Sequence, residues 1–177
     1  MKHLYLLAAA TFLLFAACHK KSAPGAGSYV PGQVIVGLNA NVPIESAFAL
    51  ANNAGTPLLN VNFYGYTSHY PADSISSLYT YLDSKPYLDT GYTKYWIRYD
   101  SASSTIGVGA MFANMTIAAQ EDWINTKKQL ALTESNTGDV MLLILVPVGQ
   151  EQKYINILQE SPIVKYACVN GTGAQLF

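Results

Sequence analysis

Hydrophobic and polar positions divide the chain from Tyr29 onward into short, strongly patterned segments. Apolar residues that alternate with polar ones, and β-branched runs, predict strands, whereas apolar residues that recur every three or four positions predict helices. This rule predicts strands at about residues 34–36, 59–63, 94–99, 105–112, 140–146 and 163–169. It predicts helices at about residues 44–51, 75–82 and 114–130, and a fourth that ends before Pro162. The predicted order is therefore β-α-β-α-β-β-α-β-α-β.

Residues that favour turns separate these segments. Pro43 falls in the first turn of the first predicted helix, and Gly55 follows its end, where a C-terminal cap belongs. Lys85 and Pro86 end the second helix. Residues 140–146 are apolar at every position, which predicts a central strand that is covered on both faces.

The first residues predict a secretory signal with a lipidation site. Lys2 and His3 precede an apolar run from Leu4 to Ala17, and Cys18 follows small residues. A cysteine in that place resembles a bacterial lipobox, and the run is shorter than the roughly 20 apolar residues that span a bilayer. We expect residues 1–17 to be a lipoprotein signal peptide, with a plain signal peptide or a membrane anchor as alternatives. Lipidated Cys18 would hold the protein in the cell envelope, on the periplasmic face or the cell surface of the outer membrane.

Residues 18–28 are rich in Lys, Ser, Gly, Ala and Pro. Such a segment cannot bury enough apolar surface to become ordered, which predicts a flexible tether. The remaining residues, 29–177, have the length of one domain. Across the chain, 50% of residues are hydrophobic and 12% are charged, a composition that predicts a well-filled core.

Charge and cysteine content narrow the range of partners. The formal net charge is -1 and the basic residues form no stripe, so we expect no nucleic acid partner. If Cys18 carries lipid, Cys168 has no cysteine left for a disulfide. We expect Cys168 to be a small buried hydrophobic residue on the last strand, because a reactive thiol needs an exposed, electropositive setting.

The sequence contains no recognisable catalytic constellation. Beyond the tether the domain has one histidine, His69, in a segment that predicts a loop, and we expect it to lie at the surface. A Gly-x-Ser-x-Gly elbow, a His-Glu-x-x-His motif and a phosphate-binding loop are all missing from the sequence. The carboxylates have no spacing typical of metal ligands. We therefore expect a protein that is not an enzyme and that has no metal and no cofactor.

Two blocks of the chain resemble the propeptide domains of subtilisin-class proteases, the inhibitor I9-like family. The first block, Tyr29–Leu38, reads as an opening strand, and the second, Val146–Asn170, reads as strand, helix and strand. The resemblance is strongest in Val-Pro-x-Gly-x-Glu at residues 146–151 and in Val-x-Tyr-Ala-x-x-Asn at residues 164–170. The chain departs from the family at Cys168, where the family usually carries an acidic residue, and in its long middle segment.

The resemblance implies an α+β fold with a ferredoxin-like (βαββαβ) antiparallel sheet and helices on one face. An α-β-β-α segment of about residues 64–138 is extra. It can be an insertion between the second and third strands of one sheet. Alternatively, residues 58–146 form a second β-α-β-β-α-β pattern that overlaps the first and widens the sheet. The sequence leaves both placements open.

The resemblance also implies a role for the C-terminal segment. In the family, the sheet packs on the protease, and the residues after the last strand lie in the substrate groove like a cleaved product. Carried over to this chain, the tail would begin at Gly171, with Leu176 and Phe177 as apolar anchors. Its candidate partner-binding residues are Gly173, Ala174, Gln175, Leu176 and Phe177. The alternative is a frayed chain end.

The aromatic residues suggest a second kind of function. Nine of the 13 tyrosines lie between Tyr64 and Tyr99. On the predicted strand at residues 94–99, alternate side chains point to opposite faces, and one face can present an aromatic platform for a glycan, a peptide or a partner protein. The candidate platform residues are Tyr95, Trp96 and Tyr99. The alternative is that the tyrosines are present because they favour strands. Trp123, on the third helix, is predicted to be a core residue.

These observations predict a non-enzymatic lipoprotein of the cell envelope with a subtilase-propeptide-like domain. Its predicted partners are the membrane, through the lipid on Cys18, and a subtilisin-class protease that it binds or inhibits in trans. The alternative is a surface module that binds a glycan or a peptide through the tyrosine-rich middle segment.

Overall fold

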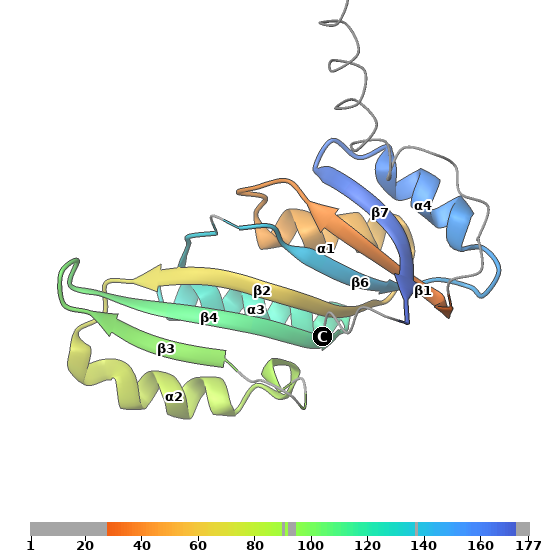
Figure 1. The fold of residues 1–177 in the computed structure, drawn as a ribbon. Coiled ribbons are helices and arrows are strands. Elements are labelled where there is room, and N and C mark those ends of the chain that lie inside the picture. Colours follow the sequence, from red (N-terminus) through yellow and green to blue (C-terminus); the bar gives the residue numbers. More distant parts are fainter. Residues whose placement is uncertain (1–27, 90, 92–94, 137, 173–177) are drawn as a thin grey trace, which may run out of the picture.

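The computed structural model describes residues 28–89, 91, 95–136 and 138–172. In these residues seven strands form one antiparallel sheet (Figure 1). The strands are β1 Tyr29–Leu38, β2 Leu58–Ser68, β3 Tyr95–Asp100, β4 Thr105–Met115, β5 Thr133–Glu134, β6 Met141–Leu145 and β7 Val164–Gly171. The α-helices are α1 Ile44–Asn53, α2 Ile75–Asp83, α3 Ile117–Gln129 and α4 Glu151–Gln159, and two short 3-10 helices, Ala72–Ser74 and Pro86–Leu88, flank α2. The predicted α+β class is confirmed, and the predicted element order is found with one addition, the two-residue strand β5.

The strand order follows from helical connections that each skip one strand. The order across the sheet is β3-β4-β2-β6-β1-β7, and the short strand β5 pairs with the second half of β2. α1 connects β1 to β2 with β6 between them, and α4 connects β6 to β7 with β1 between them. The middle segment repeats this arrangement, because α2 connects β2 to β3 around β4 and α3 connects β4 to β6 around β2. The β3–β4 hairpin therefore extends the sheet beyond β2, and the sheet is larger than a four-stranded one.

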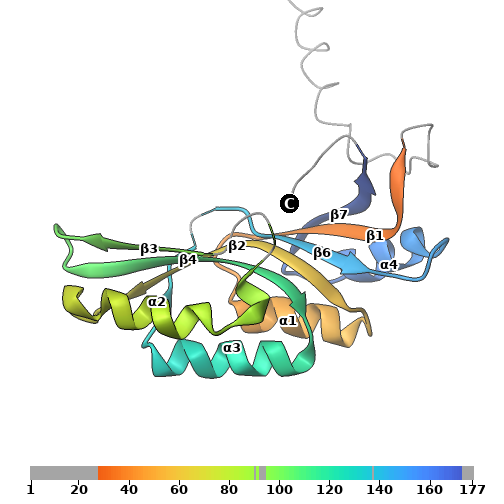
Figure 2. The ribbon, with the colours of Figure 1, turned by 90° about the horizontal axis from the view of Figure 1, so that it is seen from below.

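The four α-helices lie side by side on one face of the sheet. Figure 2 shows α1, α2 and α3 on the same side. The Asn52 amide of α1 donates to Gln120 of α3 at 2.8 Å. Lys85, just after α2, forms an ion pair with Asp122 of α3 at 2.9 Å. α1 and α4 together line a shallow cavity, and buried residues of both belong to the same core. Each helix thus covers part of one apolar layer.

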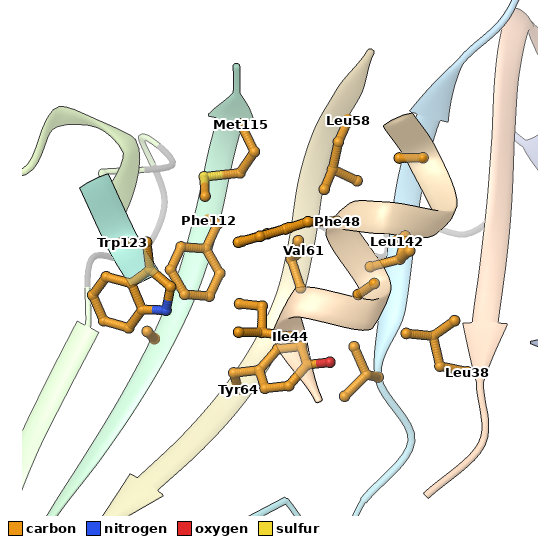
Figure 3. Packing of buried hydrophobic residues seen from close by; sticks show 14 of the residues in the cluster. Leu38, Ile44, Phe48, Leu58, Val61, Tyr64, Phe112, Met115, Trp123 and Leu142 are labelled. Carbon is orange, nitrogen blue, oxygen red and sulfur yellow. The ribbon is translucent and has the colours of Figure 1, made fainter. Parts of the chain in front are cut away.

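The core between the helices and the sheet contains a cluster of aromatic residues. Figure 3 shows Ile44 and Phe48 of α1 pointing toward Val61 of β2 and Phe112 of β4. Trp123 of α3 is fully buried, as predicted, and its ring meets that of Phe112 edge-on at a centroid distance of 4.9 Å. Burying a large apolar side chain stabilises a protein by about 1.5–3 kcal/mol, so these residues contribute much of the stability of the folded sheet–helix pair.

Local contacts explain where two of the helices begin. The amide of Ile44, the first residue of α1, donates to the Glu134 carboxylate at 3.2 Å. α3 begins after Thr116, whose hydroxyl accepts a hydrogen bond from the Ala119 amide at 3.2 Å. The sequence prediction started this helix at Asn114, which was too early, because β4 continues to Met115 and Asn114 adopts a positive φ of 53°.

The prediction that β6 is covered on both faces is only partly met. β6 is a central strand between β2 and β1, and Leu142 and Ile144 lie fully buried against the helices. The four α-helices of the described chain lie on that side alone. The opposite face of the sheet therefore has no helix over it in the described chain, which makes it a candidate binding surface.

Candidate binding surface

The helix-free side of the sheet, here called the open face, can be read from the strand register. Residues that pair directly across two antiparallel strands point to the same face. Val36, whose side chain lies in the core, pairs with Leu142 and Ala167, which belong to the same core. Their neighbours therefore point the other way. In the part formed by β1, β6 and β7, the open-face residues are Gln33, Ile35, Gly37, Met141, Leu143, Leu145, Tyr166 and Cys168.

This part of the open face is apolar and tightly packed. Ile35 and Leu143 pair directly and are both buried, although they lie outside the core beneath the helices. A Cβ added at Gly37 would lie 2.2 Å from a ring carbon of Tyr166, so the tyrosine ring lies directly on the glycine. Apolar residues therefore extend across this part of the open face from β6 to the edge strand β7, and Gln33, which accepts from the Asn170 side chain at 2.6 Å, is a polar position beside them.

Cys168 lies on this surface and corrects one sequence prediction. The residue is exposed, whereas the sequence predicted that it would be buried. The predicted strand is present, and Cys168 lies on the same face as Tyr166, since Cys168 pairs with Ile35 and Tyr166 pairs with Gly37. The prediction failed because alternation along a strand does not reveal which face the helices cover, and β7 is also an edge strand.

The two blocks that carry the propeptide resemblance meet in the structure. β1 and β7 are neighbouring antiparallel strands. The Gly32 amide donates to the Glu151 carboxylate at 2.8 Å, which links β1 to the first turn of α4. This hydrogen bond lowers the pKa of Glu151. Gly32 has a φ of +76°, which favours glycine. The glutamate of the Val-Pro-x-Gly-x-Glu motif thus has a defined structural role.

The two ends of the described chain lie side by side. The Thr172 amide donates to the Ser28 carbonyl at 2.8 Å, one step beyond the pairing of Tyr29 with Gly171. Anything attached before Ser28 and after Thr172 therefore leaves from the same corner of the sheet. The predicted lipidation site Cys18 and the predicted tail residues 173–177 lie outside the described residues.

The predicted platform of Tyr95, Trp96 and Tyr99 does not form a single surface. Trp96 pairs with Gly109 and lies on the open face, whereas Tyr95 and Tyr99 pair with Ala110 and Ile106, which are core residues of the helix side. Tyr95 donates to the Asp83 carboxylate of α2 at 3.0 Å. Burial and this carboxylate raise its pKa. Tyr95 therefore connects α2 to the sheet. Of the three predicted platform residues, only Trp96 lies on the open face.

Phe63 is the partner of Trp96 that sequence reasoning missed. The two rings lie 6.3 Å apart between centroids and are inclined by only 20°. Phe63 lies within a register irregularity of β2, between Val61 and Tyr64. Strict alternation along β2 was therefore no guide to the direction of its side chain. The glycines at positions 65, 107 and 109 were the signal in the sequence, since they leave room on the sheet for large neighbouring rings.

Ion pairs on the helix side connect neighbouring helices and strands. Lys127 of α3 lies 2.7 Å from Glu45 of α1 and 2.5 Å from Glu134 of β5. Burial alone would lower the pKa of Lys127, but its hydrogen bonds to the two glutamates outweigh this effect and raise it. Tyr87 donates to the Asp122 carboxylate at 2.5 Å beside Lys85. These charged and polar side chains bind one another. We therefore interpret them as contacts that hold the helices in place, and not as catalytic groups.

The described residues contain no candidate metal-binding cluster, and the histidine among them is exposed. His69 is exposed in the loop after β2. Within the described ranges, no group of three or more His, Cys, Asp or Glu side chains is placed to hold a metal ion. None of the helices in this part of the chain is long and apolar enough to cross a membrane. The open face is the candidate surface for recognition.

No protein-family model, curated protein or solved structure matches the chain. The functional interpretation therefore rests on the geometry of the open face and on the residues that form it.

Proposed function

We propose that this protein is a non-enzymatic binding protein of the cell envelope, anchored through Cys18, that binds a subtilisin-class protease in trans and inhibits it. The observation that carries the proposal is the meeting of the two resembling blocks in one unit. β1, β7 and α4 are joined by strand pairing and by the bond from Gly32 to Glu151. That unit presents an apolar open face, and the chain leaves it at Thr172.

We further propose that the fold is two overlapping ferredoxin-like patterns. The order β7-β1-β6-β2 and the order β3-β4-β2-β6 each have the connectivity of a βαββαβ unit, and they share β2 and β6. The first pattern corresponds to the propeptide-like domain. In that case the middle segment, about residues 64–138, widens the sheet and leaves the propeptide-like part intact.

The proposed binding mode uses the open face and the tail together. The described helices lie on the other side of the sheet, so the surface around Tyr166 and Cys168 can pack against the protease. The tail continues from Thr172, at the edge next to β1. Residues 173–177 would enter the substrate groove in extended form, with backbone hydrogen bonds for affinity and with Leu176 and Phe177 in side-chain pockets.

Inhibition assays with soluble protein that begins at Ser22 test this function. We expect inhibition of one or more subtilisin-class proteases at micromolar concentration or better, with the tail intact or trimmed only at its end by mass spectrometry. Deleting residues 173–177 should abolish inhibition and leave the circular dichroism spectrum unchanged. Absence of inhibition across the panel would refute the protease proposal, and unchanged inhibition after the deletion would refute the role of the tail.

A pair of variants tests the open face separately from the tail. Cys168→Arg places a bulky cation on the exposed part of the open face at the edge strand β7 and should weaken inhibition about tenfold or more, which corresponds to roughly 1.4 kcal/mol. Ile117→Arg is the matched control, because Ile117 is an exposed apolar residue of α3 on the helix side. Equal inhibition by both variants would show that the protease does not contact the open face.

The membrane anchor has its own test. Cys18→Ala removes the only side chain that can be lipidated at this site, so the protein should move from the membrane fraction to the soluble fraction. Retention of the variant in the membrane fraction would contradict the lipoprotein assignment and leave the binding proposal unaffected.

A further inference from the structure

The open face carries a second feature, at the opposite end of the sheet from β7. Trp96 of β3 and Phe63 of β2 both lie over Gly109 of β4. A Cβ added at Gly109 would lie 2.1 Å from Nε1 of Trp96 and 2.7 Å from Cε2 of Phe63. Both rings can approach so closely only because the glycine has no side chain. The two side chains therefore reach over Gly109 from the strands on either side of β4.

This arrangement exposes two nearly parallel aromatic rings. Trp96 is 48% exposed and Phe63 is 39% exposed, and their planes differ by 20°. Gly107 lies next to the six-membered ring of Trp96, and Gly65 lies next to Phe63, so neither position places a side chain beside the rings. Two large aromatic side chains are thus held on the open face, away from the core beneath the helices, and are here called the platform.

Polar groups border the platform. Arg98 is two residues from Trp96 on the same face of β3 and pairs with Gly107. The Ser135 hydroxyl lies 3.4 Å from the position of a Cβ at Gly65, on the Phe63 side. A guanidinium group on one side and a hydroxyl on the other can hydrogen-bond to the edges of a ligand that covers the rings.

The shape and charge of the platform select among possible ligands. Nucleic acid bases also stack on aromatic rings, but they need a basic groove for the phosphates. Here Asp100 lies on the same face of β3 as Arg98, two residues along the strand, so an acidic group accompanies the guanidinium at the border. A peptide that added a strand beside β3 would compete with Tyr79, whose hydroxyl already donates to the Ile97 carbonyl at 3.3 Å.

We propose that Trp96 and Phe63 form a carbohydrate-binding platform for a β-1,4-linked glycan. The flat C–H faces of pyranose rings stack on the two aromatic rings, and Arg98 and Ser135 hydrogen-bond to sugar hydroxyls. The site is independent of the protease-binding function and lies at the other end of the open face. It gives an envelope-tethered binding protein a second point of attachment, to a polysaccharide.

Calorimetric titration with cellohexaose and with chitohexaose tests the site. We expect the wild-type protein to bind at least one of the two hexasaccharides. Trp96→Ala should weaken binding about tenfold or more, as the loss of an aromatic hot spot does. Tyr99→Ala is the matched control: Tyr99 is 37% exposed on the same strand, but it lies on the opposite face. That variant should bind as the wild type does.

A second readout keeps the test independent of stability. Trp123 is fully buried, so a change of tryptophan fluorescence on sugar binding comes from Trp96. Trp96→Phe should lose this change and keep the calorimetric affinity within about threefold, because a phenyl ring still stacks. Wild-type protein that binds neither hexasaccharide, or that binds oligothymidylate or anionic phospholipid vesicles in their place, overturns the proposal. Equal binding by Trp96→Ala and Tyr99→Ala also overturns it.

Discussion

Trp123 joins three elements of the structure through one side chain. Its indole N–H donates to the Tyr66 hydroxyl of β2 at 3.0 Å, and its ring contacts Phe112 of β4. We expect Trp123→Phe to lower the free energy of unfolding by about 1–3 kcal/mol, because the buried Tyr66 hydroxyl loses its partner. Trp123→Ala should cost about 3–5 kcal/mol. Urea denaturation followed by far-ultraviolet circular dichroism measures both values.

The Tyr66→Phe background provides the control for this prediction. Without the Tyr66 hydroxyl, Trp123→Phe leaves no buried group unsatisfied, and its cost should fall. An identical cost in both backgrounds would mean that ring packing, and not the hydrogen bond, accounts for the loss.

The sequence predicted the burial of a single residue correctly where helical periodicity determines which side of an element faces the core. Trp123 was predicted to be in the core and is fully buried. Prediction failed at Cys168 and missed Phe63. The burial of Cys168 depends on the face that the helices cover, and the direction of Phe63 depends on a register irregularity in β2. Both are tertiary properties that alternation along one strand does not encode.

At the scale of elements, the start of α3 depends on Thr116. Its hydroxyl accepts from the Ala119 amide and satisfies one of the unpaired donors of the first turn. Thr116→Ala should therefore lower the free energy of unfolding by about 0.5–2 kcal/mol in a urea titration. Thr116→Ser keeps the oxygen and should stay close to the wild type. If the alanine and serine variants are equally stable, the hydroxyl is not a cap.

The link between β1 and α4 predicts a dependence of stability on pH. The Gly32 amide lowers the pKa of Glu151 in the folded protein. A lowered folded-state pKa gives stability that is fully present above the unfolded value of about 4.3 and is lost as the pH falls through the folded value. Glu151→Gln keeps an oxygen that can accept from Gly32 but cannot titrate. The stability difference between wild type and Glu151→Gln should therefore be constant at neutral pH and change below about pH 4.

Urea denaturation at a series of pH values between about 3 and 7 measures this difference. Glu121→Gln removes one exposed carboxylate from α3 and controls for the change in net charge. A difference between wild type and Glu151→Gln that is the same at every pH would show that the bond to Gly32 does not depend on the carboxylate charge.

At the scale of the whole molecule, the sequence left two placements of the middle segment open, and the structure has the wider sheet. Local patterns identified the hairpin of β3 and β4 and the helices around it, but strand order is set by pairing between residues far apart in the chain. Leu58 of β2 contacts both Met115 of β4 and Ile144 of β6 in register. No local pattern predicts that one strand has these two neighbours. β5 was missed for a related reason, since its two residues form a strand only by pairing with β2.

Sharing β2 and β6 between the two ends of the sheet predicts one cooperative unfolding unit. A single core extends from Trp123, under the widened end, to Leu158 of α4, under the other end. Tryptophan fluorescence reports on the widened end, because Trp96 and Trp123 both lie there, whereas far-ultraviolet circular dichroism reports on the whole fold. In urea the two transitions of the wild-type protein should coincide.

Leu158→Ala makes this test decisive, because it removes a buried side chain far from both tryptophans and should cost about 2–5 kcal/mol. If the sheet unfolds as one unit, the fluorescence midpoint must fall by as much as the circular dichroism midpoint, although the fluorescent residues lie at the other end. A fluorescence midpoint that stays unchanged while the circular dichroism signal is lost earlier would mean that the widened end folds on its own. The shared strands would then connect two units of separate stability, and either end of the open face could be studied in isolation.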